Sequence, residues 1–302
     1  MAFLVAGFAL FRDGIFIHEI AHLRSGELRA FRIGWNVIFG ITSLTPSFMY
    51  SNHADHHKRD TYGTRQDGEY LPLGNGPRRQ LVAYFLQVPA LPFLALVRFM
   101  ILTPLSLLHP RMRRWVLERA SSYAISPWYR RTLRVGERRG LWIVTELVIF
   151  VGLTTLALLV ANGTLRWQLI AKFYFLATFG IGLNWIRNTG AHRYRNRGGK
   201  LSYDAQLADS INVVGPRPLV DLMFPIGLRY HALHHLFPTL PYHALDEAHR
   251  RLMARLPADS PYRKTVQPSY FAAVTELWRG ARAFDRQAGS GPAEDGRSSP
   301  AR

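Results

Sequence analysis

The sequence predicts an all-α integral membrane protein, a helical bundle with a histidine-rich site on its cytoplasmic face. Residues 141–161 and 167–186 are apolar runs of 21 and 20 residues, and each contains a single charged side chain. A helix of about 20 apolar residues matches the thickness of the hydrocarbon core of a bilayer. Eight of the twelve histidines also fall into three short clusters beside apolar stretches. Together these observations indicate a membrane protein that binds metal.

The composition excludes several kinds of chemistry. The chain has no cysteine, which rules out disulfides, thiolate-bound zinc, iron–sulfur clusters and a cysteine nucleophile. Its 38 Lys and Arg residues exceed its 20 Asp and Glu residues, for a net charge of +18. A nucleic-acid-binding protein would carry such charge on a soluble basic module. Here the arginines flank apolar spans, where topology and anionic lipid explain them, so we expect no nucleic-acid partner.

The apolar stretches before residue 140 are less regular. Residues 1–17 contain one adjacent charged pair and should cross the membrane once, ending inside at His18. They lack the basic start and cleavage site of a secretory signal. Residues 34–50 are short and are expected at the interface. Residues 81–108 are interrupted by three prolines and by Arg98, which predicts an in-plane or re-entrant element.

Charge predicts the orientation of the hairpin formed by residues 141–161 and 167–186. Residues 111–140 carry nine arginines and two glutamates, whereas the turn of the hairpin has only Arg166. By the positive-inside rule both flanks of the hairpin are cytoplasmic. Glu146 and Lys172 lie near opposite ends of the hairpin, so we expect each to reach the interface separately.

One domain accounts for most of the chain. Residues 1–275 hold every apolar span and every histidine cluster, and they contain no internal repeat. Residues 276–302 are rich in Gly, Ser, Pro and charge, which predicts a disordered C-terminal tail.

The histidine clusters have the spacing of metal ligands. They read HxxxH (His18, His22), HxxHH (His53, His56, His57) and HxxHH (His231, His234, His235). Spacings of three and four residues place side chains on one face of a helix, so each cluster can present two or three imidazoles to one point. A zinc site takes four ligands in total, whereas eight or nine nitrogens suit two metal ions.

The first cluster also fits a rival interpretation. HEIAH at residues 18–22 is the HExxH motif of zinc metalloproteases, with Glu19 as the general base. That interpretation explains only two of the eight clustered histidines and is the weaker one. A non-catalytic metal-binding membrane protein is a third alternative.

The three clusters and the apolar spans between them resemble the membrane fatty acid desaturase and hydroxylase superfamily. HALHHLFPTLPYH, at residues 231–243, is similar to the acyl desaturases in particular. Asn188 and His192 form an NxxxH element, which in acyl desaturases supplies an additional histidine ligand and an asparagine that acts through a bound water. The likeness covers residues 1–255. Members usually have four transmembrane helices, and this chain departs from that pattern by lacking the first.

The resemblance implies an O2-dependent oxidoreductase with two non-haem irons. Its expected substrate is a fatty acyl chain linked to a lipid, to CoA or to a carrier, and desaturation is the favoured reaction. The alternative is a hydroxylase, ketolase or alkane monooxygenase of the same superfamily. The expected location is a bacterial inner membrane. The implied catalytic residue is Asn188, and the implied iron ligands are His18, His22, His53, His56, His57, His192, His231, His234 and His235.

Further residues are candidates for supporting roles. Ligating histidines usually donate their second ring N–H to a carboxylate or a carbonyl. The acids within or between the clusters are therefore candidates to hold the rings, although each is as well explained as a solvated acid: Glu19, Asp55, Asp204, Asp209 and Asp221. The histidines outside the clusters are weaker ligand candidates: His109, His243 and His249.

Electrons must come from a second protein. The chain has no cysteine for an iron–sulfur centre, no cytochrome b5-type haem motif and no dinucleotide fingerprint. A ferredoxin- or cytochrome-type donor is therefore expected. The nine arginines of residues 111–140 would attract an acidic donor, or would anchor topology and bind anionic lipid.

Overall fold

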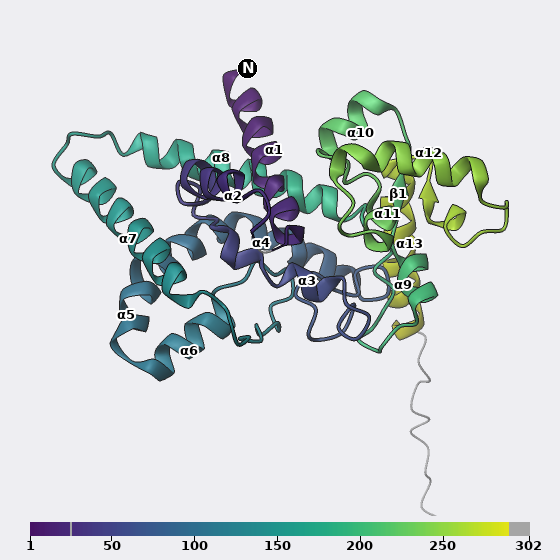
Figure 1. The fold of residues 1–302 in the computed structure, drawn as a ribbon, viewed down its shortest axis with the longest axis horizontal. Coiled ribbons are helices and arrows are strands. Elements are labelled where there is room, and N and C mark those ends of the chain that lie inside the picture. The colour runs from purple at the N-terminus through teal and green to yellow at the C-terminus, as the bar shows by residue number, and fades with distance from the viewer. Residues whose placement is uncertain (25, 290–302) are drawn as a thin grey trace, which may run out of the picture.

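The computed structural model describes residues 1–24 and 26–289, and these form a mostly helical molecule with long connecting loops (Figure 1). The α-helices are α1 (Ala2–His22), α2 (Arg29–Trp35), α3 (His53–His56), α4 (Arg78–Leu96), α5 (Thr103–Leu108), α6 (Pro110–Arg119), α7 (Arg139–Ala161), α8 (Gln168–Asn188), α9 (Tyr203–Asp209), α10 (Arg217–Met223), α11 (His231–Leu236), α12 (Leu245–Arg255) and α13 (Tyr270–Gly289). Two short parallel strands pair with each other: β1 (Asn212–Val213) and β2 (Val266–Gln267). Short 3-10 and π turns complete the chain: Asn36–Gly40, Ser47–Tyr50, Val97–Leu102, Tyr242–Ala244 and Arg263–Thr265. The predicted all-α class is confirmed.

Three helical segments of the described chain are long and apolar enough to cross a membrane: Arg78–Leu108, α7 and α8. The first differs from the expected in-plane element, because α4, a π turn and α5 join into one continuous segment. A proline in a packed apolar helix removes a backbone hydrogen bond without ending the helix. The expected crossing at residues 1–17 falls in α1, which is not among the three and carries Arg12, Asp13 and Glu19.

Glu146 of α7 points into the protein and does not extend outward by itself, so the expectation of a separate, interfacial side chain is wrong. Its side chain is fully buried and forms ion pairs with Arg98 of the π turn and with Arg113 of α6, the latter at 2.5 Å. Arg98 also donates to Thr103 and Ser121. A carboxylate between apolar helices is stable only when it is paired, which explains its inward position. Figure 1 shows α5, α6 and α7 gathered at one end of the molecule.

The other end of the molecule is built from α9 to α13, and α4 and α8 run toward it (Figure 1). The expected disordered tail is wrong as far as Gly289, because residues 276–289 belong to α13. Ala273, Leu277 and Ala281 repeat every four residues and form a buried stripe along this helix. A Cβ at Gly280 would lie 2.2 Å from the carbonyl oxygen of Gly74, so only glycine permits this close packing. Residues 290–302 lie outside the described residues.

Candidate metal centre

All nine predicted histidine ligands converge in the structure. They form a five-histidine group (His18, His22, His53, His57, His234) and a four-histidine group (His56, His192, His231, His235). Within each group the potential ligand nitrogens lie within 4.8 Å of one another. The rings of His57 and His235, one from each group, stack with centroids 4.3 Å apart, so the groups are immediate neighbours.

Each HxxHH cluster serves both groups, which spacing alone did not predict. On α11, His231 and His235 are four residues apart and join the four-histidine group, while His234 joins the other group. In the cluster that begins α3, His53 and His57 are also four residues apart, but they join the five-histidine group. The third member, His56, joins the four-histidine group. Residues four apart share a helix face, and the third residue projects to the side of that face.

The ring nitrogens have the separations of ligands on a common ion. In the four-histidine group, Nε2 of His192 lies 2.8 Å from Nε2 of His231 and 3.1 Å from Nε2 of His56. In the five-histidine group, Nε2 of His234 lies 3.0 Å from Nε2 of His22. Two nitrogens bound at right angles at about 2.1 Å from one ion are about 3.0 Å apart. The donor set and its spacing therefore fit two metal ions.

Carboxylates and a tyrosine hold the rings through their second nitrogens. Nδ1 of His56 lies 2.8 Å from Asp67, and Nδ1 of His53 lies 2.7 Å from Glu69. The hydroxyl of Tyr62 lies 2.8 Å from Nδ1 of His192 and donates to Asp209 at 2.8 Å. Such bonds orient the rings so that Nε2 faces the metal position.

Sequence reasoning identified only one of these holding groups. Asp209 was among the candidates, but Asp67, Glu69 and Tyr62 were missed. The available signal was a short polar segment, TYGTRQDGEY at residues 61–70, directly after the second cluster. A loop of polar residues following a ligand cluster can fold back onto it, but its spacing has no helical period that would show this.

The other candidates lie elsewhere. Asp55 pairs with Lys58 and Arg134, and Asp221 pairs with Arg229. Asp204 stands in the first turn of α9. Glu19 is 3.6 Å from Nδ1 of the adjacent His18, too long for a hydrogen bond. The additional histidines are outside both groups: His109 caps α6, His249 bonds Tyr262, and His243 lies in a 3-10 turn.

Burial keeps most of the imidazoles neutral. It lowers the pKa of His22 to about 4, and it is the main cause that lowers the pKa of His18, His192 and His234 well below the ordinary value. His56 is the exception: burial lowers its pKa, but the charge and hydrogen bond of Asp67, together with the charges of Glu69 and Asp209, raise the pKa of His56 above the ordinary value. Neutral imidazole is the form that binds metal.

Asn188 is the last residue of α8 and is one turn before His192. Its Oδ1 accepts a hydrogen bond from Nη2 of Arg187 at 3.4 Å. Among the described residues, no contact joins its amide to a histidine of either group. Its predicted role through a bound water therefore stays a prediction.

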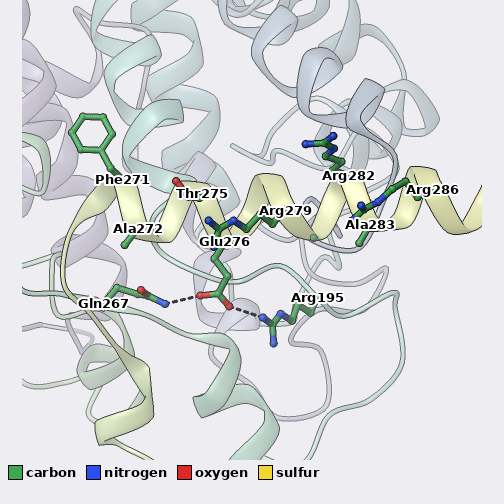
Figure 2. A pocket seen from close by; sticks show the side chains of 11 residues that line it. Arg195, Gln267, Phe271, Ala272, Thr275, Glu276, Arg279, Arg282, Ala283 and Arg286 are labelled. Atoms are coloured by element: carbon green, nitrogen blue, oxygen red, sulfur yellow. Dashed lines mark hydrogen bonds and ion pairs between the residues drawn. The ribbon is translucent and has the colours of Figure 1, made fainter.

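A groove of about 1010 Å³ runs along α13, away from both histidine groups. Figure 2 shows Glu276 on its floor, reaching Gln267 and Arg195. Three exposed arginines that have no carboxylate partner among the described residues also line it: Arg279, Arg282 and Arg286. The groove is therefore strongly basic.

The sequence and these groups agree with a known family. Residues 1–266 match the fatty acid desaturase family. The chain belongs to this family. A relative named ceramide hydroxylase, from Caulobacter vibrioides (strain NA1000 / CB15N), is 37% identical over 296 residues, which cover 97% of this chain and 83% of the relative. No solved structure matches the chain.

As a member of the desaturase family, the chain is a membrane oxidoreductase, and the predicted resemblance to the desaturase and hydroxylase superfamily is confirmed. The relative is named as a hydroxylase. This favours the alternative of hydroxylation over desaturation, the reaction that the clusters had suggested first.

Proposed function

We propose that this protein hydroxylates the chain of an N-acyl lipid of the ceramide type. The observation that carries the proposal is the 37% identity with a ceramide hydroxylase along almost the whole chain. The convergence of nine histidines supports a metal-dependent oxidation. Desaturation is the second candidate, because the matched family is that of the fatty acid desaturases.

The proposed reaction consumes O2 and an external reductant. One oxygen atom enters a C–H bond to give an alcohol, and the other leaves as water with two electrons and two protons. Breaking an unactivated C–H bond exceeds what a side-chain acid or base can do, so a bound metal must supply the O2-derived oxidant. The chain's own residues bind the ions, orient the ligand rings and keep the site dry.

Two irons are the metals that we propose. The five-histidine group would hold one and the four-histidine group the other. Asp67, Glu69 and the Tyr62–Asp209 pair would fix the rings through hydrogen bonds. The zinc protease alternative loses support, because five histidines around one position exceed the three protein ligands of a catalytic zinc site.

We place the site on the cytoplasmic face of a bacterial inner membrane, since arginine-rich segments flank the hairpin of α7 and α8. The reductant would be a separate ferredoxin- or cytochrome-type protein, because the chain carries no motif for a redox cofactor of that kind.

Purified protein and expressing cells together test this function. We expect about two irons per chain by elemental analysis. Lipid profiling should show an N-acyl lipid that is sixteen mass units heavier in cells expressing the chain, and not in cells expressing His234→Ala. A loss of two mass units would assign desaturation instead, and one tight zinc without iron would contradict the proposal.

A further inference from the structure

Arg187 is a buried cation whose counter-charge is missing. It lies on α8, five residues before His192. The residue is buried, with 8% of its surface exposed to solvent. Nε donates to Oδ1 of Asn184 at 3.0 Å, and Nη2 donates to Oδ1 of Asn188 at 3.4 Å. Among the described residues, no carboxylate lies within ion-pair distance of its guanidinium, and Nη1 has no hydrogen-bond partner.

The other buried arginines of the described chain are all paired. Arg98 meets Glu146, Arg131 meets Glu137 at 3.3 Å, and Arg229 meets Asp221 at 3.0 Å. A buried charge without a counter-charge is costly. Nη1 of Arg187 is not among the fully buried atoms, so it is a donor that an acceptor from outside the chain can reach.

The guanidinium acts on both histidine groups. Burial is the main cause that lowers the pKa of His18 and of His192, and the positive charge of Arg187 contributes to the shift at each. His18 belongs to the five-histidine group and His192 to the four-histidine group. Asn184, Arg187 and Asn188 share one face of α8 and form a polar patch at the end of this apolar helix, four to eight residues before His192 of the four-histidine group.

We propose that this patch binds the acyl carbonyl oxygen of the lipid, so that the oxidised carbon lies within a few bonds of that carbonyl. The methylene groups in the middle of an acyl chain have no hydrogen-bond acceptor. If they packed against Arg187, they would exclude water from the guanidinium without accepting a hydrogen bond from it. A carbonyl directly attached to the acyl chain supplies the missing acceptor and positions the carbons next to it at the irons. This inference rests on the proposed function and specifies where the substrate is attacked.

Two kinds of lipid carry a hydrogen-bond acceptor for Arg187 at this position. One is an N-acyl lipid, through its amide carbonyl, and the other is a free fatty acid, through its carboxylate. Binding measurements on the metal-loaded protein distinguish them. The probes are a ceramide, the free fatty acid of the same chain length, and the corresponding n-alkane, which has no oxygen. Arg187→Met should bind the ceramide about 10- to 100-fold more weakly, as expected for a hydrogen bond from a charged group, and bind the alkane as tightly as wild type. Weakening confined to the fatty acid would assign the patch to a carboxylate.

The position of oxidation is the second readout. Tandem mass spectrometry should place the new hydroxyl close to the carbonyl in wild type, and Arg187→Met should spread it along the chain. Unchanged ceramide binding in Arg187→Met, or a wild-type product oxidised in the middle of the chain, would overturn the proposal. If wild type removed two hydrogens instead, the hydroxylase function would fail while the binding comparison still tested Arg187.

Arg187 also contributes positive charge near Glu69, so its removal could disturb the site as a whole. Arg187→Lys keeps that charge but lacks the planar fork that spans two amides and a carbonyl. If Arg187→Met loses iron, Arg187→Lys provides the test. Weaker ceramide binding and a displaced hydroxyl with iron retained support the carbonyl site, and wild-type behaviour in both readouts contradicts it.

Discussion

A histidine binds metal more effectively when its second ring nitrogen is hydrogen-bonded, because that bond fixes the orientation of the ring. Asp67 and Glu69 do this for His56 and His53, and Tyr62 does it for His192. His18 differs, because neither of its buried ring nitrogens has a hydrogen-bond partner among the described residues. Its ring is therefore positioned by packing alone until a metal binds.

Asp67→Asn tests the holding role at a single residue. The amide cannot supply the negative charge that strengthens His56 as a ligand, so we expect iron affinity to fall about 10- to 100-fold. Asp55→Asn is the matched control, since Asp55 pairs with Lys58 and Arg134 instead of a histidine. Iron titration measures the affinity of each variant. Equal iron affinities for Asp67→Asn and Asp55→Asn would show that Asp67 does not strengthen His56 as a ligand.

Asn188→Ala tests the predicted role of the asparagine one turn before His192. We expect lower turnover with most of the iron retained, because the residue would act on a bound water or on the lipid carbonyl and not as a direct ligand. Asn162→Ala, at the end of the neighbouring helix α7, controls for the loss of a helix-end asparagine. Turnover equal to wild type in both variants would leave Asn188 a purely structural role.

At the scale of elements, the buried Arg98–Glu146–Arg113 network ties the π turn, α7 and α6 together. Removing the carboxylate would leave two cations in an apolar environment. Glu146→Gln should therefore destabilise the protein by about 3–5 kcal/mol. Lys172→Gln removes an exposed charge of α8 and should change stability little.

Thermal unfolding in detergent measures both effects. Because the cost arises from unpaired charge, a variant combining Glu146→Leu, Arg98→Leu and Arg113→Leu should recover much of the stability lost in Glu146→Gln. Equal melting temperatures for Glu146→Gln and Lys172→Gln would refute a stabilising role for the network.

At the scale of the whole molecule, two basic surfaces are candidate binding sites for the proposed electron donor. In residues 111–140, Arg113 and Arg131 are committed to buried or partly buried ion pairs, which leaves fewer free charges than the sequence suggested. The groove along α13 has three unpaired arginines. It is also connected to the site, because the backbone N–H of Arg195 donates to Asp209, which accepts from Tyr62 beside His192.

Charge-reversal variants at each surface identify which one binds the electron donor. Arg279→Glu with Arg282→Glu should weaken binding of an acidic [2Fe–2S] ferredoxin at low salt by at least about tenfold and lower ferredoxin-driven turnover in parallel. Turnover driven by dithionite should be unchanged. Arg111→Glu with Arg119→Glu, on α6, is the matched control, and a larger effect there would move the dock to residues 111–140. Binding that does not depend on ionic strength would contradict an electrostatic dock at either surface.

The sequence by itself determined the class of fold and the candidate metal ligands, but not the favoured reaction. Spacings of three and four residues, together with apolar runs of about 20 residues, are local patterns that report helix faces and membrane spans directly. They selected eight of the nine histidines that converge, and the resemblance of the NxxxH element to that of the acyl desaturases supplied the ninth, His192.

Only the tertiary structure decided which histidine joins which group, and which residues hold the rings. It also showed that residues 276–289 are helical, that Glu146 is buried against Arg98, and that Arg187 has no ion-pair partner within the described part of the chain. These features depend on contacts between residues as many as 212 positions apart, such as His22 and His234. Periodicity along one helix indicates which face is buried but not what lies against it, because the partner is set by packing between distant segments.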